Sequence, residues 1–176
     1  MALKIRDANR FGRLTEERLT RLEKRLKGRL PEDYRQFLLK HNGGRPTLSR
    51  FTFTSDDEEQ KSILEWFFAV HDEPYEEDED WDPECSEGLP PHFAQPLEDA
   101  WRELKSELPR SGTLPIGRDP SANLVCLGYS GKRAGQVFLF DHDMGELVPL
   151  ADSFTAFLDG LTKLPPGDWA PWLIVK

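Results

Sequence analysis

The sequence predicts a mixed fold of strands and helices organised around one β-hairpin. Two short runs rich in Val, Phe and Leu, Asn123–Tyr129 and Gln136–Asp141, are joined by a polar connection that contains Gly, which is typical of paired antiparallel strands. Both faces of the second run are apolar until its end, as in a central strand that is covered on both sides. Elsewhere apolar residues recur at helical spacing, so we expect helices to cover this sheet.

Composition limits the class of protein. The 176 residues suffice for a single domain, residues 1–176, with a core expected at about 14–161, and 38% hydrophobic residues indicate a soluble globular chain. No apolar run is long enough to span a bilayer, and Met1–Arg10 lacks the apolar core of a secretory signal. We therefore expect a cytoplasmic protein with no membrane partner. Cys85 and Cys126 are too few and too far apart for a metal knuckle or a disulfide framework.

Charge is distributed unevenly along the chain. Residues 1–50 hold 14 Lys/Arg and 6 Asp/Glu, a formal charge of +8, which leaves −17 for the remainder of a chain with net charge −9. No Lys or Arg stands between Ser62 and Trp101. Such a field repels nucleic acid and attracts basic proteins, so the predicted partner is a cationic protein. Nucleic-acid binding by residues 1–50 is disfavoured because their Arg and Lys interleave as a solvated helix face.

The basic N-terminal part predicts two helices. Thr15 is a suitable N-cap for the first, whose leucines share one face, and Gly28 is expected to end it in a left-handed conformation. Pro31 suits the first position of a second helix, and Asn42–Gly44 is expected to stop it.

The next residues predict strands. Arg50–Ser55 alternates polar and apolar residues, so it should be a half-buried strand, followed by a polar turn at Asp56–Glu59. Ser62–Val70 has a length that suits either a strand or a short helix. Its aromatic and β-branched content favours a strand beside the first.

The C-terminal half predicts three further elements and a packed tail. A helix is expected to open at Pro96, a strand at Glu146–Leu150, and a last helix after Asp152 as its cap. The tail at residues 165–176 carries two Trp, so we expect it to pack back on the body.

An acidic stretch at residues 72–88 is predicted to be a loop, because like charges repel at this density and prolines follow it. Its carboxylates would steer a basic partner, and its aromatic residues would anchor that partner once docked. The alternative is a solvated insertion that keeps the protein soluble. The candidate partner-binding residues are Asp72, Glu73, Tyr75, Glu76, Glu77, Asp78, Glu79, Asp80, Trp81 and Asp82.

Motifs for catalysis are incomplete. Asp141–Asp143 places His142 between two carboxylates, the raw material of general base catalysis. Neighbours along a strand point to opposite faces, and no Ser or Cys is identifiably aimed at the imidazole, so a strand end entering a turn is favoured over a hydrolase. Gly128–Lys132 completes neither a nucleophile elbow nor a phosphate loop. No catalytic residue or cofactor is predicted.

Metal sites are equally incomplete. Asp78, Asp80 and Asp82 have the spacing of the first ligands of a calcium loop, but Pro83 stands where the turn requires Gly. The four His show no paired metal-ligand spacing. We predict no metal site.

Four motifs, taken in order, resemble the SUKH superfamily of the Smi/Knr type, which contains fungal cell-wall assembly regulators and many bacterial immunity proteins. They are Leu30–Leu38 (LPEDYRQFL) running into Asn42–Pro46 (NGGRP), Leu114–Asp119 (LPIGRD), Gly135–Asp143 (GQVFLFDHD) and Ala151–Leu158 (ADSFTAFL). The resemblance covers residues 14–161. The chain departs from the family at Ala122, where the family often has Gly.

The resemblance implies an α+β fold, with a largely antiparallel central sheet and helices packed on it. It also implies motif residues that are structural, no catalytic residues, and function by binding. The leading hypothesis is a non-enzymatic immunity protein that neutralises a cognate toxin by direct binding, often a nuclease with a basic surface. The alternative is a regulatory or scaffolding module whose intracellular partner is unrelated to toxins.

Overall fold

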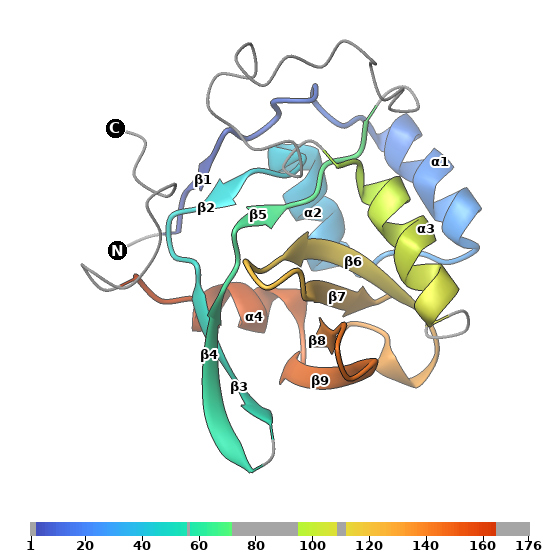
Figure 1. Ribbon diagram of the computed structural model, residues 1–176. Coiled ribbons are helices and arrows are strands. Elements are labelled where there is room, and N and C mark those ends of the chain that lie inside the picture. Colours follow the sequence, from blue (N-terminus) through green and yellow to red (C-terminus); the bar gives the residue numbers. More distant parts are fainter. Residues whose placement is uncertain (1–2, 56, 72–94, 109–111, 165–176) are drawn as a thin grey trace, which may run out of the picture.

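The computed structural model describes residues 3–55, 57–71, 95–108 and 112–164. This part of the chain contains four α-helices, nine short strands and one 3-10 turn (Figure 1). In order they are β1 (Ile5–Arg6), α1 (Glu16–Leu26), α2 (Glu32–His41), β2 (Arg45–Pro46), β3 (Arg50–Ser55), β4 (Glu58–Ile63), β5 (Trp66–Phe67), α3 (Leu97–Glu107), β6 (Thr113–Arg118), β7 (Leu124–Gly128), the 3-10 turn η2 (Gly131–Arg133), β8 (Val137–Asp141), β9 (Glu146–Ala151) and α4 (Phe154–Gly160).

The main sheet has five strands in the order β5-β6-β7-β8-β9, and every neighbouring pair is antiparallel. β7 and β8 form the hairpin that the sequence predicts, with Val125 opposite Leu139. Two smaller sheets pair β1 with β2 and β3 with β4. The expected α+β architecture with a largely antiparallel sheet is confirmed.

Both faces of this sheet are covered. Val125 and Leu139 belong to the main core, which also contains residues of α1, α2 and α4. Cys126 and Phe140 point to the other face and pack with Leu104 of α3. Alternate residues of a strand face opposite sides, so each side of β7 and β8 needs its own apolar cover. The expectation of a central strand at residues 136–141 is confirmed.

The first helix begins as predicted and ends differently. The hydroxyl of Thr15 accepts a hydrogen bond from the Arg18 N–H at 3.3 Å, as an N-cap does. The left-handed residue at the end is Lys27, with φ of 55°, and not Gly28 as expected. Gly28 is small for another reason, because a Cβ there would lie 2.8 Å from the Tyr129 ring.

The other helix ends follow the same chemistry. Asn42 ends α2 in a left-handed conformation with φ of 38°, which confirms the stop predicted at residues 42–44. The cap of α4 is Ser153, whose hydroxyl accepts from the Ala156 N–H at 3.0 Å. The prediction of Asp152 as this cap is wrong by one residue.

Residues 62–70 are extended, but they pair with strands of two different sheets. The first two complete β4 beside β3, whereas Trp66 and Phe67 pair with β6. The chain changes partner at the intervening residues: the Leu64 N–H donates to the Ser49 carbonyl at 2.7 Å and the Glu65 N–H to the Arg118 carbonyl at 3.0 Å. The preference for strand over helix is right, while placement of the whole segment beside the first strand is wrong.

β6 is a strand that the sequence does not predict, because Pro115 and Gly117 interrupt its pattern. The register with β7 shifts between these two residues, so the proline lies at a bulge. Gly117 allows close approach of β5, since a Cβ there would lie 2.5 Å from the Trp66 carbonyl oxygen. The short pair of β1 and β2 also escapes prediction.

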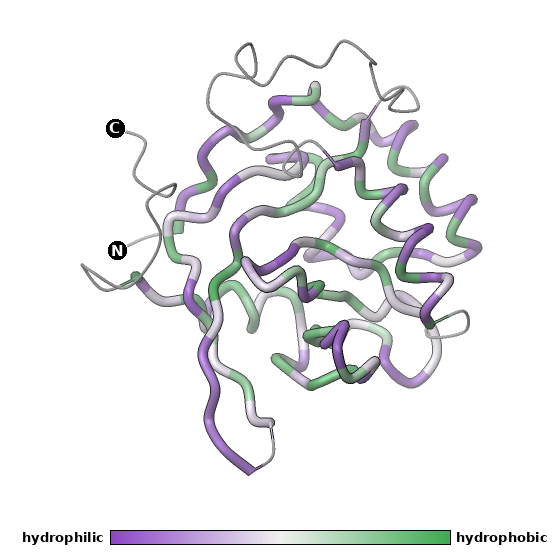
Figure 2. Tube along the Cα trace, in the orientation of Figure 1, coloured by the Kyte–Doolittle hydropathy of each residue, from purple (hydrophilic) through white to green (hydrophobic). Residues whose placement is uncertain are grey.

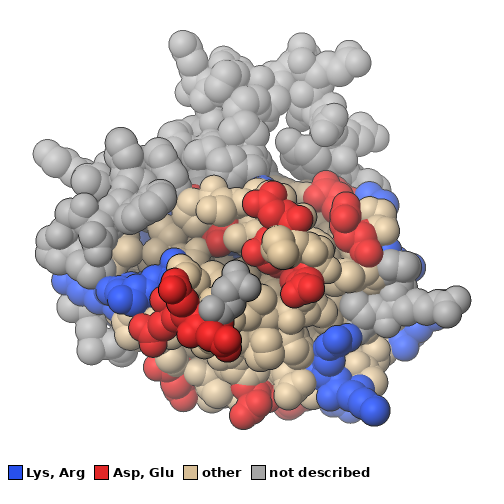
Figure 3. Space-filling model, turned by 60° about the horizontal axis from the view of Figure 1, so that its bottom comes forward, with Lys and Arg blue, Asp and Glu red and all other residues tan. Residues whose placement is uncertain are grey.

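The hairpin of β3 and β4 projects from the body of the fold (Figure 1). Its two strands differ, because β4 is hydrophilic along most of its length (Figure 2). Phe51 is buried and packs edge-on against Phe157 of α4, and the ring centroid of Phe53 lies 6.3 Å from that of Phe51. Both phenylalanines turn inward, which confirms the half-buried strand predicted at Arg50–Ser55. On the face brought forward in Figure 3, acidic side chains form several groups and basic ones lie toward the margins.

Candidate functional site

All ten predicted partner-binding residues, from Asp72 to Asp82, lie outside the described residues, as do Cys85 and the tail at residues 165–176. What the structure describes is the place where the acidic stretch joins the fold. Ala69 and Pro96 form a parallel bridge, and the Leu97 N–H donates to the Ala69 carbonyl at 2.8 Å. The described residues on the two sides of residues 72–94 are therefore hydrogen-bonded to each other.

Asn42 fixes the first side of this junction. Its side-chain carbonyl accepts from the Val70 N–H at 2.9 Å, and its amide donates to the Val70 carbonyl at 3.0 Å and to the Gly12 carbonyl at 2.8 Å. Asn42 is 1% exposed, so these bonds form away from water. The Arg18 guanidinium adds a bond to the Val70 carbonyl at 3.1 Å. The sequence identifies Asn42 only as a helix stop.

The residue before the acidic stretch is also held by packing. His71 stacks on Phe11 with ring centroids 4.2 Å apart. Burial lowers the pKa of His71 below its usual value, so the imidazole is neutral near pH 7. The contact is ring stacking of a neutral side chain.

The enzyme-like triplet forms a turn between β8 and β9. One Asp141 carboxylate oxygen accepts from the N–H groups of Asp143 and Met144, at 2.9 and 3.1 Å, which closes the turn. His142 Nε2 lies 3.3 Å from Asp143 Oδ1, so the argument that neighbouring side chains point apart does not hold for this pair. The other ring nitrogen, Nδ1, lies 2.9 Å from Asn123 Oδ1. Among the described residues, the imidazole of His142 bonds to the side chains of Asn123 and Asp143 and not to a Ser, Thr or Cys side chain, so the hydrolase hypothesis lacks a nucleophile there.

A polar network around Asp119 joins the hairpin to the main sheet. Asp119 is 2% exposed, and its Oδ1 accepts from the N–H groups of Ser121 and Asn123 at 2.9 Å each. Its Oδ2 accepts from the Ser62 hydroxyl at 2.8 Å and from the Asn123 amide at 3.2 Å. The left-handed Ala122, with φ of 67°, sits inside this turn, where the family often has Gly. The network holds the β6–β7 turn against β4.

Glu65 is a buried carboxyl next to this network. The pKa of Glu65 is raised to about 7, mainly by burial: the nearby charge of Asp119 adds to the rise, and the charges of Arg118 and Arg45 reduce it. The group therefore titrates near neutral pH.

The remaining candidates for chemistry are inert. Burial raises the pKa of the Cys126 thiol well above its usual range, and its Sγ points to the Leu124 carbonyl. In the described ranges no group of three His, Cys, Asp or Glu side chains is arranged to hold a metal ion. No helix in the same ranges combines the length and apolar character of a membrane span.

The family comparison agrees with this architecture. The model of the SMI1 / KNR4 family (SUKH-1) matches residues 13–160, most of the chain. The chain belongs to this family. No curated protein matches the sequence. The SUKH family is generally non-catalytic, and membership suggests a protein-binding role in immunity or regulation.

The SUKH motifs of this chain have structural roles. In the first motif, Asp33 Oδ2 accepts from the Thr155 N–H at 2.9 Å and the Thr155 hydroxyl at 3.1 Å, which joins α2 to the first turn of α4 in the last motif. Tyr34 is fully buried and packs edge-on against Phe154, again between these two motifs. Asp119 of the second motif organises its own turn. The motif residues therefore join helices to one another and stabilise turns.

Proposed function

We propose that this SUKH protein is a cytoplasmic immunity protein that neutralises a cognate toxin by direct binding. The acidic residues between Asp72 and Asp82 are its contact surface, and the toxin presents a basic surface such as the nucleic-acid site of a nuclease. The protein makes and breaks no bond in its partner.

The observation that carries this proposal is the position of the acidic run. No Lys or Arg stands between Ser62 and Trp101, and the run joins the fold at the Ala69–Pro96 bridge. Anchored charge of one sign accelerates encounter with a partner of the opposite sign and mimics the phosphates that a nuclease binds.

Basic residues of α1 and α2 support recognition of a cationic protein and not of nucleic acid. Arg25 pairs with Glu98 at 3.0 Å, and Arg35 pairs with Glu23 and Glu16 at 2.6 and 2.7 Å. These cations are engaged within the fold, so they do not form a free surface for nucleic acid.

The test is binding to the product of the neighbouring gene. The purified product should be toxic alone, should bind this protein in a pull-down, and should lose its toxicity when bound. A product that neither binds nor is toxic removes the proposal.

The role of the acidic run is tested by neutralising its centre, from Glu76 to Asp80, as Gln and Asn. Association should slow by about tenfold or more at low salt, and its salt dependence should flatten. The control carries an equal change in net charge at exposed carboxylates outside β4: Glu103, Glu107, Glu146, Asp152 and Asp159. Equal association rates for the two variants would make the run a solubilising insertion.

A regulatory or scaffolding role is the second candidate, because the family suggests both roles. It predicts an intracellular partner and no toxin gene next to this one. Genomic context and the toxicity assay separate the two candidates.

A further inference from the structure

The outer edge of β4 carries backbone groups that have no partner among the described residues. Arg50 of β3 donates its N–H to the Thr162 carbonyl at 3.1 Å and accepts from the Thr162 N–H at 2.9 Å. Both bonds lie on the side of β3 away from β4, and peptide groups alternate in direction along paired strands. Ile63, opposite Arg50, and Lys61, two residues earlier, therefore turn their peptide groups toward the outer edge of β4.

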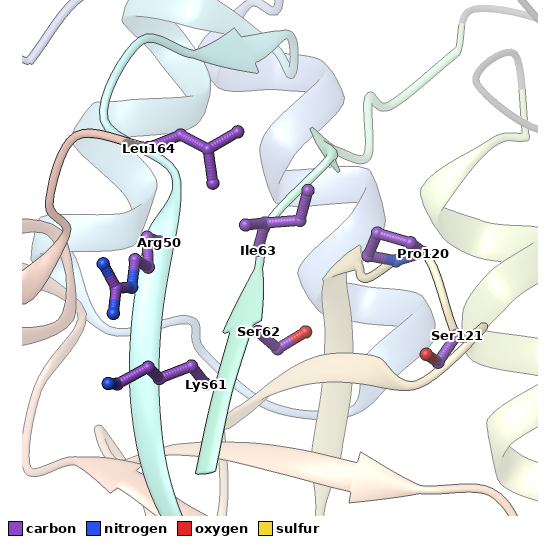
Figure 4. A pocket seen from close by; sticks show the side chains of 7 residues that line it. All are labelled: Arg50, Lys61, Ser62, Ile63, Pro120, Ser121 and Leu164. Atoms are coloured by element: carbon purple, nitrogen blue, oxygen red, sulfur yellow. The ribbon is translucent and has the colours of Figure 1, made fainter. Parts of the chain in front are cut away.

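A cavity of about 270 Å³ opens beside this edge (Figure 4). It lies between the hairpin and the β6–β7 turn, with Leu164 above (Figure 4). Its walls combine the cations of Arg50 and Lys61, the hydroxyls of Ser62 and Ser121, and the apolar side chains of Ile63 and Leu164. Such a lining suits a ligand with one anionic group on an apolar body.

The two cations of this cavity differ from three arginines of α1 and α2. Arg21, Arg25 and Arg35 each lie within 3.3 Å of a carboxylate. Within the described part of the chain, neither Arg50 nor Lys61 lies within ion-pairing distance of a carboxylate. A carboxylate placed between them would gain charge-assisted hydrogen bonds without displacing an existing partner.

The wall opposite β4 is preformed. Asp119 holds the N–H groups of Ser121 and Asn123, and it binds the Ser62 hydroxyl of β4 at 2.8 Å. The turn and the strand therefore keep their separation before any ligand binds. A preformed site loses little conformational entropy on binding.

We propose that the outer edge of β4 and this cavity bind an extended segment of another protein that carries one Asp or Glu between apolar residues. The segment adds as a strand that pairs with the peptide groups of Lys61 and Ile63. Its carboxylate lies between Arg50 and Lys61, and its apolar neighbours contact Ile63 and Leu164. This surface is separate from the acidic run, and the proposal does not rest on the proposed function.

Two other occupants are less suited to the edge. A second copy paired antiparallel and centred on the cavity would place Lys61 opposite Lys61, which sets like charges side by side. The chain after Leu164 contains Pro165, Pro166 and Pro171, which have no N–H to donate to a strand pair.

The test selects ligands from a displayed library of random decapeptides on the full chain, followed by synthesis and affinity measurement. Selected peptides should contain an Asp or Glu with apolar neighbours, and its change to Asn or Gln should weaken binding by about tenfold or more. Arg50→Gln should weaken binding similarly, whereas Lys40→Gln, an exposed cation on α2, should leave the affinity within about twofold.

Pairing through the backbone is tested separately. Lys61→Pro removes one outward N–H of β4 and should weaken binding by about tenfold or more. Peptides N-methylated at alternate residues test the same bonds on the unaltered protein, so the result does not depend on folding of the variant. One of the two methylation patterns should abolish binding, and the other should be tolerated.

Four results would overturn the proposal or assign the edge of β4 to another occupant. The proposal is overturned if no peptide binds with a Kd below about 100 μM. It is also overturned if peptide affinity is unchanged by Arg50→Gln and by both methylation patterns. Deletion of residues 165–176 that raises peptide affinity by about tenfold would assign the edge to the chain's own tail. A dimer that Lys61→Pro dissociates, seen by analytical ultracentrifugation, would assign it to a second copy.

Discussion

The five-stranded sheet and the β3–β4 hairpin are built from the same kind of antiparallel pairing and have opposite surroundings. In β8, four consecutive residues from Val137 to Phe140 are buried, because helices cover both faces. In β4, residues 58–61 are exposed, and only the last residue, Ile63, is buried. The hairpin projects beyond the helices (Figure 1).

This difference indicates that the main sheet contributes mostly to stability and that the hairpin contributes mostly to binding. A strand that is covered on both faces and paired on both sides, as β8 is, contributes apolar burial and has no free edge. A projecting strand such as β4 contributes little burial and presents backbone groups along its outer edge. Substitutions in the sheet should therefore change the free energy of unfolding, and substitutions in β4 should change binding.

The largest effect is expected in the sheet. Leu139 is 1% exposed and packs in the main core, so Leu139→Ala should lower the free energy of unfolding by about 2–5 kcal/mol. Urea unfolding followed by circular dichroism measures the change. Leu139→Met, which conserves volume, should cost less than about 1.5 kcal/mol. Equal costs for the two variants would contradict tight packing at this position.

A smaller effect is expected where the two regions meet. Asp119→Ala removes the acceptor for two backbone N–H groups and for the Ser62 hydroxyl, and should cost about 2–3 kcal/mol. Ser62→Ala removes only the bond from the hairpin and should cost about 1 kcal/mol. The same unfolding measurement applies, and a Ser62→Ala cost as large as that of Asp119→Ala would show that the turn depends on the hairpin.

The raised pKa of Glu65, at the same junction, should make the free energy of unfolding depend on pH. Its pKa rises to about 7 in the folded state, mainly through burial, so the folded state holds a proton that the unfolded state releases near pH 4.5. The stabilisation from this proton is complete below about pH 4.5 and is lost as the pH rises to about 7. Glu65→Gln keeps a neutral side chain and should be more stable than the parent by about 2 kcal/mol at pH 8.

The control for Glu65→Gln is the same comparison at pH 5, where the difference between variant and parent should be small. Other titrating groups, such as His41 and His71, contribute equally to both proteins and cancel in the difference. A stability difference that is the same at both pH values would contradict a raised pKa for Glu65.

The smallest effect is expected on β4. Glu59 is exposed and makes no hydrogen bond within the described ranges, so Glu59→Gln should change the free energy of unfolding by less than about 0.5 kcal/mol. A larger change would show that this edge of the hairpin is engaged in the folded protein.

The sequence predicts strands where side-chain pattern and backbone chemistry agree. β7 and β8 are apolar runs between turn residues, and β3 alternates, so all three are predicted close to their observed bounds. β6 is missed because Pro115 and Gly117 argue against a strand, although the first lies at a bulge and the second permits contact with Trp66. Both roles depend on contacts with the neighbouring strands, so the sequence alone does not show them.

Site chemistry is less accessible from the sequence. The acidic run is visible as composition, but the fixation of its base by Asn42 depends on a contact with Val70, 28 residues away. The Asp119 network likewise joins β4 to a turn that lies 57 residues later. From the sequence, an Asp or Asn is predicted to be a turn or cap residue. Its hydrogen bonds to residues far away in the sequence are visible only in the tertiary structure.

The Ala69–Pro96 bridge has a consequence for how relatives of this chain diverge. A segment whose two attachment points are already hydrogen-bonded to each other is lengthened or exchanged at little cost, since doubling a closed loop costs only about 0.6 kcal/mol. Changes in the length or sequence of the chain between these two points therefore leave the pairing of Ala69 with Pro96 in place.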